Sequence, residues 1–234
     1  MIAQTAEEHN SRWERLWASG LEPGTAFDMM GSSPALINLL RTHPEIARGK
    51  SVIVPGCGRG YDLATFMQAG AHTATGLELS ATATLEANAY LASLPDLQQE
   101  CQRYHGQASV RQGDFFDILN QGGSTAVQYQ IGYDYTFLCA LQRGMHQLWA
   151  DSWSATIQPG GELITLMFPV VLPVSEADVG PPFPVTPELY SQLLTPAFEL
   201  ISIERVPDNE SHSMRAGREW MGRWRRKVAP HQKL

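Results

Sequence analysis

The sequence predicts an α/β fold in which helices pack against a sheet of mostly parallel strands. Short apolar runs alternate along the chain with segments of helical periodicity, which is the pattern of repeated strand–helix–strand units. Some of these runs are almost wholly apolar, as strands buried on both faces are, and glycine-rich turns adjoin them. With 234 residues, the chain is expected to form a single domain over residues 1–234.

In the first half of the chain, the periodicity predicts four helices and three strands. The helices are expected at 5–19, 34–41, 61–69 and 81–94, and the strands at 51–55, 73–79 and 108–112. Pro34 occupies a first-turn position that helices tolerate, and Ser80 is a typical N-cap for the helix that follows it. The stretch 21–33 contains one proline and two glycines, so we expect it to be a loop.

The second half continues the alternation. Strands are expected at 133–138, 162–168 and 198–205, with a final strand within 217–227, and helices at 145–157 and 186–195. The sequence Pro159-Gly160-Gly161 is expected to stop the first of these helices. Residues 170–187 are rich in proline and irregular, and long loops of this kind tend to carry function.

Composition and charge exclude several classes of protein. The chain has 17 Lys and Arg against 24 Asp and Glu, a net charge of −7, which disfavours a nucleic-acid partner. No apolar run has the length of a membrane helix, and residues 1–10 lack the basic and apolar regions of a secretory signal. Three widely spaced cysteines indicate a reducing compartment, so we expect a cytoplasmic protein. The seven histidines lack metal-ligand spacing, and no metal is expected.

Three polar or glycine-rich features follow three successive predicted strands. Glycines 56, 58 and 60 come after the first strand, Glu78 ends the second, and Asp114-Phe115 follows the third. Parallel sheets bind ligands beyond the carboxyl ends of their strands. Each feature also has a purely structural interpretation: a tight turn, a solvated acid, or a loop acid before core aromatics. Their occurrence in order at successive strand ends favours a nucleoside site, with Glu78 on the ribose and Asp114 on the adenine.

The cofactor of such a site could be a dinucleotide or S-adenosylmethionine. The dinucleotide fingerprint G-x-G-x-x-G requires a glycine where this chain has Tyr61, and the third glycine comes one residue early, at Gly60. An adenine-binding acid after the third strand also suits a compact mononucleoside better. The sequence therefore favours S-adenosylmethionine over a nicotinamide cofactor.

Several longer strings carry a family resemblance that covers roughly residues 13–226. They are V-I-V-P-G-C-G-R-G-Y-D at 52–62, G-L-E-L-S at 76–80, D-F-F at 114–116, D-Y-T-F-L-C-A at 134–140, P-G-G-E-L-I-T-L-M-F-P at 159–169 and G-P-P at 180–182. In this order they resemble the thiopurine/thiol S-methyltransferase family, and within it the plant-type thiol, thiocyanate and halide methyltransferases.

The resemblance implies a fold and a cofactor site. The fold is the class I S-adenosylmethionine-dependent methyltransferase (Rossmann-like) sandwich, a mostly parallel seven-stranded sheet with helices on both faces. Gly56 and Gly58 are expected to line the methionine part of S-adenosylmethionine, and Glu78 to accept the ribose. Asp114 and Phe115 are expected to hold the adenine.

The resemblance also implies a cap and a reacting centre. Residues 1–33 are expected to cap the cofactor through the aromatic side chains Trp13, Trp17 and Phe27. Tyr135 is expected at the end of the fourth strand as a catalytic residue that also contacts the cofactor. Residues 170–185 are expected to form the substrate-side loop.

Asp28 and Phe183 are expected to contact the methyl acceptor. Asp28 lies next to a departure from the family pattern, and Phe183 is itself such a departure. Ala26-Phe27-Asp28 stands where relatives have Pro-Trp-Asp, and Phe183 stands where plant-type relatives often have tyrosine. The predicted reaction is methyl transfer to a small soft nucleophile: a thiol, thiocyanate, bisulfide or a halide. The alternatives are a thioether acceptor such as a methylthio acid, which gives a sulfonium product, and a non-catalytic cofactor-binding protein.

Overall fold

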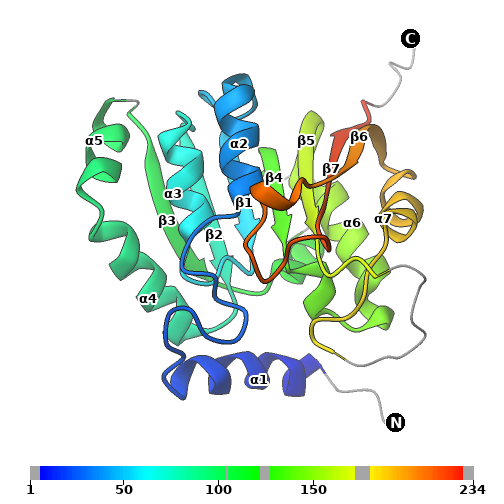
Figure 1. Ribbon diagram of the computed structural model, residues 1–234, viewed down its shortest axis with the longest axis horizontal. Helices are drawn as coiled ribbons and strands as arrows, with labels where there is room; N and C mark the ends of the chain where they lie inside the picture. Colours follow the sequence, from blue (N-terminus) through cyan, green and yellow to red (C-terminus); the bar gives the residue numbers. More distant parts are fainter. Residues whose placement is uncertain (1–5, 104, 122–126, 172–179, 229–234) are drawn as a thin grey trace. The chain divides into compact units, whose positions relative to one another are not determined.

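The computed structural model describes residues 6–103, 105–121, 127–171 and 180–228 (Figure 1). The described residues contain seven strands, and the chain divides into two compact units, Met1–Phe115 and Phe116–Leu234. No helix in the described ranges is long and apolar enough to cross a membrane.

Unit 1 contains three parallel strands in the order β3-β2-β1. They are β1 (Ser51–Pro55), β2 (Thr73–Glu78) and β3 (Gln107–Gln112). Ser51 pairs with Thr73 and Thr73 pairs with Gln107, so the three carboxyl ends lie at one edge. The connections contain the helices α3 (Tyr61–Gln68), α4 (Ala81–Ala92) and α5 (Pro95–Arg103). These crossovers make the strands parallel, as the sequence predicts.

Two further helices of unit 1 precede the sheet. They are α1 (Ala6–Ala18) and α2 (Pro34–Thr42), and the short 3₁₀ turn η1 (Pro44–Ile46) follows them. The side chain of Ser80 accepts a hydrogen bond from the N–H of Ala83 at 3.0 Å, which confirms the predicted N-cap of α4. Helix α5 departs from the prediction, because its sequence is mostly polar and Leu97 is its buried residue.

Unit 2 contains four strands in the order β4-β5-β7-β6. They are β4 (Tyr129–Tyr135), β5 (Ile157–Met167), β6 (Phe198–Arg205) and β7 (Trp220–Arg226). The helices are α6 (His146–Thr156) and α7 (Pro187–Leu194), and the 3₁₀ turns are η2 (Phe115–Gln121), η3 (Leu138–Ala140), η4 (Arg143–Met145) and η5 (Asp208–Glu210). Strands β4 and β5 are parallel.

The strand arrangement is mixed rather than wholly parallel. Strand β7, which confirms the expected final strand, runs antiparallel to both β5 and β6. The connection from β6 to β7 contains no α-helix to carry the chain across the sheet, so the direction reverses.

The Pro159-Gly160-Gly161 segment corrects a predicted boundary. Helix α6 ends at Thr156, and the three residues lie inside β5 instead of separating the helix from the strand. A Cβ on Gly161 would stand 2.7 Å from the carbonyl oxygen of Gln130, so only glycine lets the two strands approach there.

Large apolar side chains fill the interior of unit 2. Trp149, Trp153 and Trp224 are fully buried. A Cβ on Gly132 of β4 would lie 2.4 Å from the ring of Trp153, so the glycine makes room for the indole. This packing fixes the strand that ends at Tyr135.

Candidate active site

The glycine loop after β1 and the carboxylate at the end of β2 form one hydrogen-bonded structure. Gly58 has φ +52°, a left-handed conformation that favours glycine. Its N–H donates to Oε2 of Glu78 at 3.0 Å, and the N–H of Leu79 donates to Oε1 at 2.9 Å. Glu78 is 6% exposed, and burial raises the pKa of its carboxyl while the backbone donors oppose that rise.

The backbone donors around Glu78 use three acceptor positions of its carboxylate. A carboxylate offers about four acceptor positions. The N–H groups of Gly58, Leu79 and Ser80 occupy three of them, the last at 3.3 Å. One hydroxyl can be accepted without displacing a protein donor, so the residues fit the ribose of S-adenosylmethionine.

Asp114 and Phe115 follow the end of β3. The N–H of Gly113 donates to the carbonyl of Glu78 at 2.9 Å, which ties this turn to the end of β2. Asp114 is half-buried and Phe115 is 5% exposed. The structure thus brings the expected ribose and adenine residues to one edge of unit 1.

Helix α1 is attached to the start of α4 by Glu14. Its carboxylate accepts hydrogen bonds from the hydroxyls of Ser80 and Thr82, each at 2.6 Å. These hydrogen bonds lower the pKa of Glu14. Since Ser80 follows Glu78 by two residues, α1 lies beside the turn that carries the expected ribose ligand.

The aromatic side chains of the expected cap meet one another. The ring of Phe27 lies 5.8 Å from those of both Trp13 and Trp17, in edge-to-face arrangements. Trp17 is 2% exposed, and a Cβ on Gly58 would stand 3.7 Å from its ring. The cap therefore packs against the glycine loop, and its contact with the cofactor stays a prediction.

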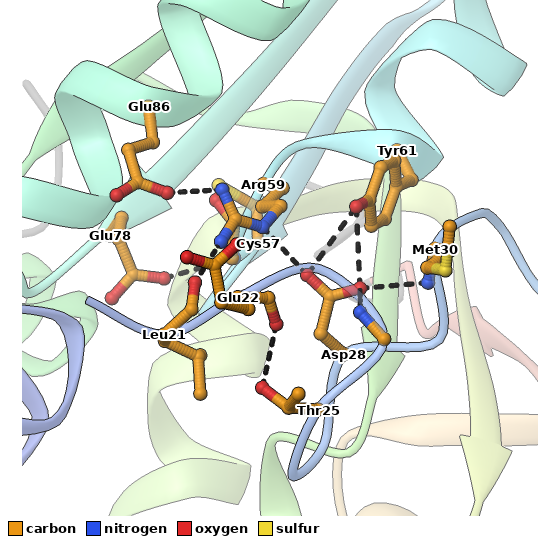
Figure 2. A network of polar contacts seen from close by, with 12 residues as sticks. Leu21, Glu22, Thr25, Asp28, Met30, Cys57, Arg59, Tyr61, Glu78 and Glu86 are labelled. Atoms are coloured by element: carbon orange, nitrogen blue, oxygen red, sulfur yellow. Dashed lines mark hydrogen bonds and ion pairs between the residues drawn. The ribbon is translucent and has the colours of Figure 1, made fainter.

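Arg59 is the centre of a polar network that local sequence patterns do not predict (Figure 2). Its Nε donates to Oδ2 of Asp28 at 2.7 Å, and its other nitrogens bind the Glu86 carboxylate and the carbonyl of Leu21. The guanidinium also lies 5.2 Å from the centre of the Trp17 ring. One side chain of the glycine loop thus holds α4, α1 and the segment between α1 and α2.

Asp28 is held by residues of its own unit. Its Oδ1 accepts the N–H of Met30 at 2.7 Å, and the hydroxyl of Tyr61 lies 3.3 Å away (Figure 2). Burial, with the nearby Asp28 charge, raises the pKa of Tyr61 to about 12. These contacts give Asp28 a part in fixing the cap, and its expected contact with the acceptor stays a prediction.

Arg59→Ala should expose the 20–31 segment to proteolysis. Asp28 is 6% exposed, and loss of one partner of a buried ion pair costs about 3–5 kcal/mol. We expect cleavage in this segment to accelerate by roughly tenfold or more, measured by timed digestion of the ligand-free protein. Arg48→Ala, on an exposed arginine, is the matched control. Equal rates for the two variants would show that the network does not hold the cap.

Tyr135, in unit 2, is the last residue of β4 and binds a buried carboxylate. Its hydroxyl donates to Oε1 of Glu219 at 2.7 Å, and the hydroxyl of Ser211 donates to Oε2. Glu219 is 1% exposed. The guanidinium of Arg215 lies 4.8 Å from the centre of the Tyr135 ring and 4.7 Å from that of Phe168. Glu219 and Ser211 were not singled out from the sequence.

The turn after β4 is built on Asp134. This fully buried carboxylate accepts the indole N–H of Trp149 at 2.7 Å and the N–H of Leu138 at 3.4 Å. Burial raises its pKa to about 6. Thr136, which lies between Asp134 and Leu138, has φ +62°, an unusual conformation for a β-branched residue. Its hydroxyl donates to the carbonyl of Tyr135 at 2.6 Å.

Phe183 belongs to the described part of the substrate-side loop. Its N–H donates to the carbonyl of Cys139 at 2.7 Å, which places it beside the turn after β4. The Cys139 thiol is 2% exposed, and burial raises its pKa, as expected of a core residue. Residues 172–179 of the loop lie outside the described residues.

The order of elements and the fold define the class of protein. The structure resembles the 1,6-didemethyltoxoflavin-N1-methyltransferase of Burkholderia thailandensis solved with S-adenosylhomocysteine, with TM-score 0.65, 16% identity and coverage of 97% of this chain and 93% of that one. It also resembles the glycopeptide N-methyltransferase MtfA, with TM-score 0.61, 15% identity and coverage of 96% and 99%. The chain has the α/β fold of class I methyltransferases.

Residues 8–232 match the family model described as Thiopurine S-methyltransferase (TPMT). The chain belongs to this family, and it is an S-adenosylmethionine-dependent methyltransferase.

Curated relatives match over nearly the whole chain. "Probable thiol methyltransferase 2" of Arabidopsis thaliana is 33% identical, over 98% of this chain and 91% of its own length. "Thiocyanate methyltransferase 1" of Brassica oleracea is 30% identical, over 96% and 88%. The thiopurine S-methyltransferase of Shewanella amazonensis is 28% identical, over 82% and 84%.

Proposed function

We propose that this enzyme methylates a small, soft sulfur nucleophile or halide: a thiol, thiocyanate, bisulfide or a halide ion. The observation that carries the proposal is Arg215, a guanidinium 5% exposed that lies against the rings of Tyr135 and Phe168. A buried cation in aromatic surroundings suits a weakly hydrated anion better than a large polar substrate. The names of the thiol and thiocyanate methyltransferase relatives support the same acceptor class.

In this proposal, unit 1 holds S-adenosylmethionine. Gly56 and Gly58 line its methionine part, Glu78 accepts the ribose, and Asp114 with Phe115 holds the adenine. The cofactor supplies a methyl group on a sulfonium and leaves as S-adenosylhomocysteine. The chain's own contribution is to align the acceptor and to keep water out. The cap of Trp13, Trp17 and Phe27 keeps water out.

We further propose that the enzyme acts in the cytoplasm on a small-molecule substrate, with neither a nucleic-acid nor a membrane partner. The free thiols of Cys57, Cys101 and Cys139 support a reducing compartment.

A thioether acceptor is the second candidate, and Phe183 favours it. A phenylalanine cannot take a proton, and a thioether has none to lose, whereas a neutral thiol must become a thiolate before it attacks. The test is to incubate the enzyme with labelled S-adenosylmethionine and a panel of thiols, thiocyanate, iodide and methylthio acids. Formation of an uncharged product, which is a methyl sulfide from a thiol, methyl thiocyanate or methyl iodide, supports the first candidate. A sulfonium product formed from methylthio acids alone would replace it with the second.

Phe183→Tyr should raise activity toward neutral thiols near pH 7 more than activity toward iodide. The new hydroxyl could accept or pass on the thiol proton, and iodide has no proton to lose. The measurement is kcat/KM for a simple thiol and for iodide between about pH 6 and about pH 9, across the ordinary thiol pKa. A parallel change for both substrates would mean that residue 183 acts through packing.

A further inference from the structure

A neutral thiol acceptor requires a group that takes its proton. An ordinary thiol has a pKa near 8.5, so the thiolate is a minor species at neutral pH. Phe183 has no hydroxyl to take the proton. We propose that Tyr135 takes the proton of a neutral thiol and passes its own to Glu219, so that the two side chains form a proton relay. This inference rests on the proposed function.

The direction of the hydrogen bond defines the relay. Because Tyr135 donates its hydrogen to Oε1 of Glu219 at 2.7 Å, its phenol oxygen meets any further partner as an acceptor. Tyr135 is half-buried, whereas Glu219 is 1% exposed, so the carboxylate can reach a substrate proton through the tyrosine. The Ser211 hydroxyl donates to Oε2 and holds the carboxylate in place.

The two kinds of charge beside Tyr135 act in opposite directions on the phenol oxygen during the transfer: the guanidinium of Arg215 favours negative charge there, and the carboxylate of Glu219 opposes it until it takes the proton. Arg215 is 5% exposed and lies 4.8 Å from the centre of the Tyr135 ring. Arg218 lies 5.1 Å from the centre of the Phe168 ring, on which Arg215 also packs, and Tyr133 lies 6.3 Å from Tyr135, ring to ring. The charged groups beside these two rings thus include Arg215 and Arg218, with Glu219 on the hydroxyl of Tyr135.

Methyl transfer to a neutral thiol breaks an S–H bond and a carbon–sulfonium bond and forms one new carbon–sulfur bond. The S–H bond of the thiol breaks as its proton goes to the oxygen of Tyr135, and the hydrogen of Tyr135 moves to Oε1 of Glu219. The electron pair left on sulfur forms the new bond to the methyl carbon. The pair of the broken carbon–sulfonium bond stays on S-adenosylhomocysteine. Glu219 returns its proton through Tyr135 to water after the product leaves.

Two other groups near the turn after β4 are poorly suited to this task. The thiol of Cys139 is 2% exposed, and burial keeps it protonated. Asp134 is fully buried, and its oxygens accept the indole of Trp149 and the N–H of Leu138. Asp134 therefore acts on the backbone of the turn, whereas Glu219 binds the half-buried hydroxyl.

The test compares Tyr135→Phe and Glu219→Gln on a simple thiol and on iodide. Both changes keep the side-chain shape. At about pH 7, kcat/KM for the thiol should fall by roughly 100-fold in each variant, while that for iodide changes much less. The double variant should be no worse than either single one, because both belong to one relay. As the pH rises past the thiol pKa, the variants should approach wild type, because the substrate supplies its own thiolate.

A readout without turnover tests the hydrogen bond itself. In the cofactor-free protein, tyrosinate absorbance should appear at lower pH in Glu219→Gln than in wild type, because the carboxylate charge that opposes ionisation of Tyr135 is gone. Tyr129→Phe, at the other end of β4, is the control and should leave the ratio of thiol to iodide activity unchanged.

The outcomes separate the relay from the proposed function. Wild-type activity on thiols and iodide, with thiol activity unchanged in both variants, would overturn the relay alone. An equal loss on both substrates would assign the pair a structural role and would also overturn it. Wild-type activity on none of the soft nucleophiles would overturn the proposed function. Thermal unfolding midpoints show whether Tyr135→Phe or Glu219→Gln is misfolded. If one of them is, Ser211→Ala replaces it in the comparison and should give a smaller loss of activity on the thiol alone.

Discussion

Glu78→Ala should bind S-adenosylmethionine about 10- to 150-fold more weakly than wild type. A hydrogen bond between the ribose and an ionised carboxylate contributes about 1.5–3 kcal/mol, and the change removes it. The carboxylate is 6% exposed and is already held by the N–H groups of Gly58 and Leu79, so little ordering is needed when the ligand arrives. Isothermal calorimetry of the ligand-free protein measures the affinity directly.

Controls separate binding from folding in that experiment. Glu78→Ala also leaves the backbone donors of Gly58 and Leu79 without their acceptor, so its unfolding midpoint is measured alongside. Glu45→Ala removes an exposed carboxylate of the same unit and should leave the affinity unchanged. The nicotinamide cofactor NAD should not bind to wild type. An unchanged affinity of Glu78→Ala for S-adenosylmethionine would remove Glu78 from the proposed site.

Asp134 should make the protein less stable as the pH rises from about 4 to about 7. Burial raises its pKa to about 6 from an ordinary 3.8, so the folded protein binds the proton more tightly than the unfolded chain. The free energy of unfolding therefore falls through this window, by about 3 kcal/mol in all. Urea unfolding of wild type and Asp134→Asn, compared at each pH, isolates the contribution of this residue.

The neutral amide of Asp134→Asn does not titrate, so the other carboxyls cancel in the difference. Wild type should lose stability relative to the variant as the pH rises, whichever protein is more stable at pH 7. A difference that is constant with pH would show that Asp134 is not the titrating group.

The sequence predicts every strand and every α-helix of the described residues except α5, but it places the starts of β4 and β5 too late, at 133 and 162 instead of Tyr129 and Ile157. Strands β1 and β6 have the expected bounds, because their residues form sharply limited apolar or alternating runs. Helix α5 has one buried residue, Leu97, in a mostly polar sequence, so the alternation of apolar runs does not indicate it. The start of β5 at Ile157 is hidden because the strand continues through Pro159-Gly160-Gly161, a sequence that usually ends an element and that fits there through the close approach of Gly161 to β4.

The residues of the candidate site divide in the same way. Glu78 can be found from the sequence because it stands at the end of a readable strand. The partners of Arg59 and Tyr135 cannot, because Asp28 is 31 residues from the arginine and Glu219 is 84 residues from the tyrosine. Contacts between distant parts of a chain depend on the fold, and local patterns do not contain them.

The strained backbone of Thr136 lowers the stability of the folded chain. A β-branched residue at φ +62° costs about 1–3 kcal/mol relative to a relaxed backbone, and glycine would adopt that conformation without strain. Threonine contributes the hydroxyl that binds the carbonyl of Tyr135 and limits the freedom of the turn. A glycine at this position would therefore relieve the strain, but it would leave the turn that follows Tyr135 without the hydroxyl that holds it.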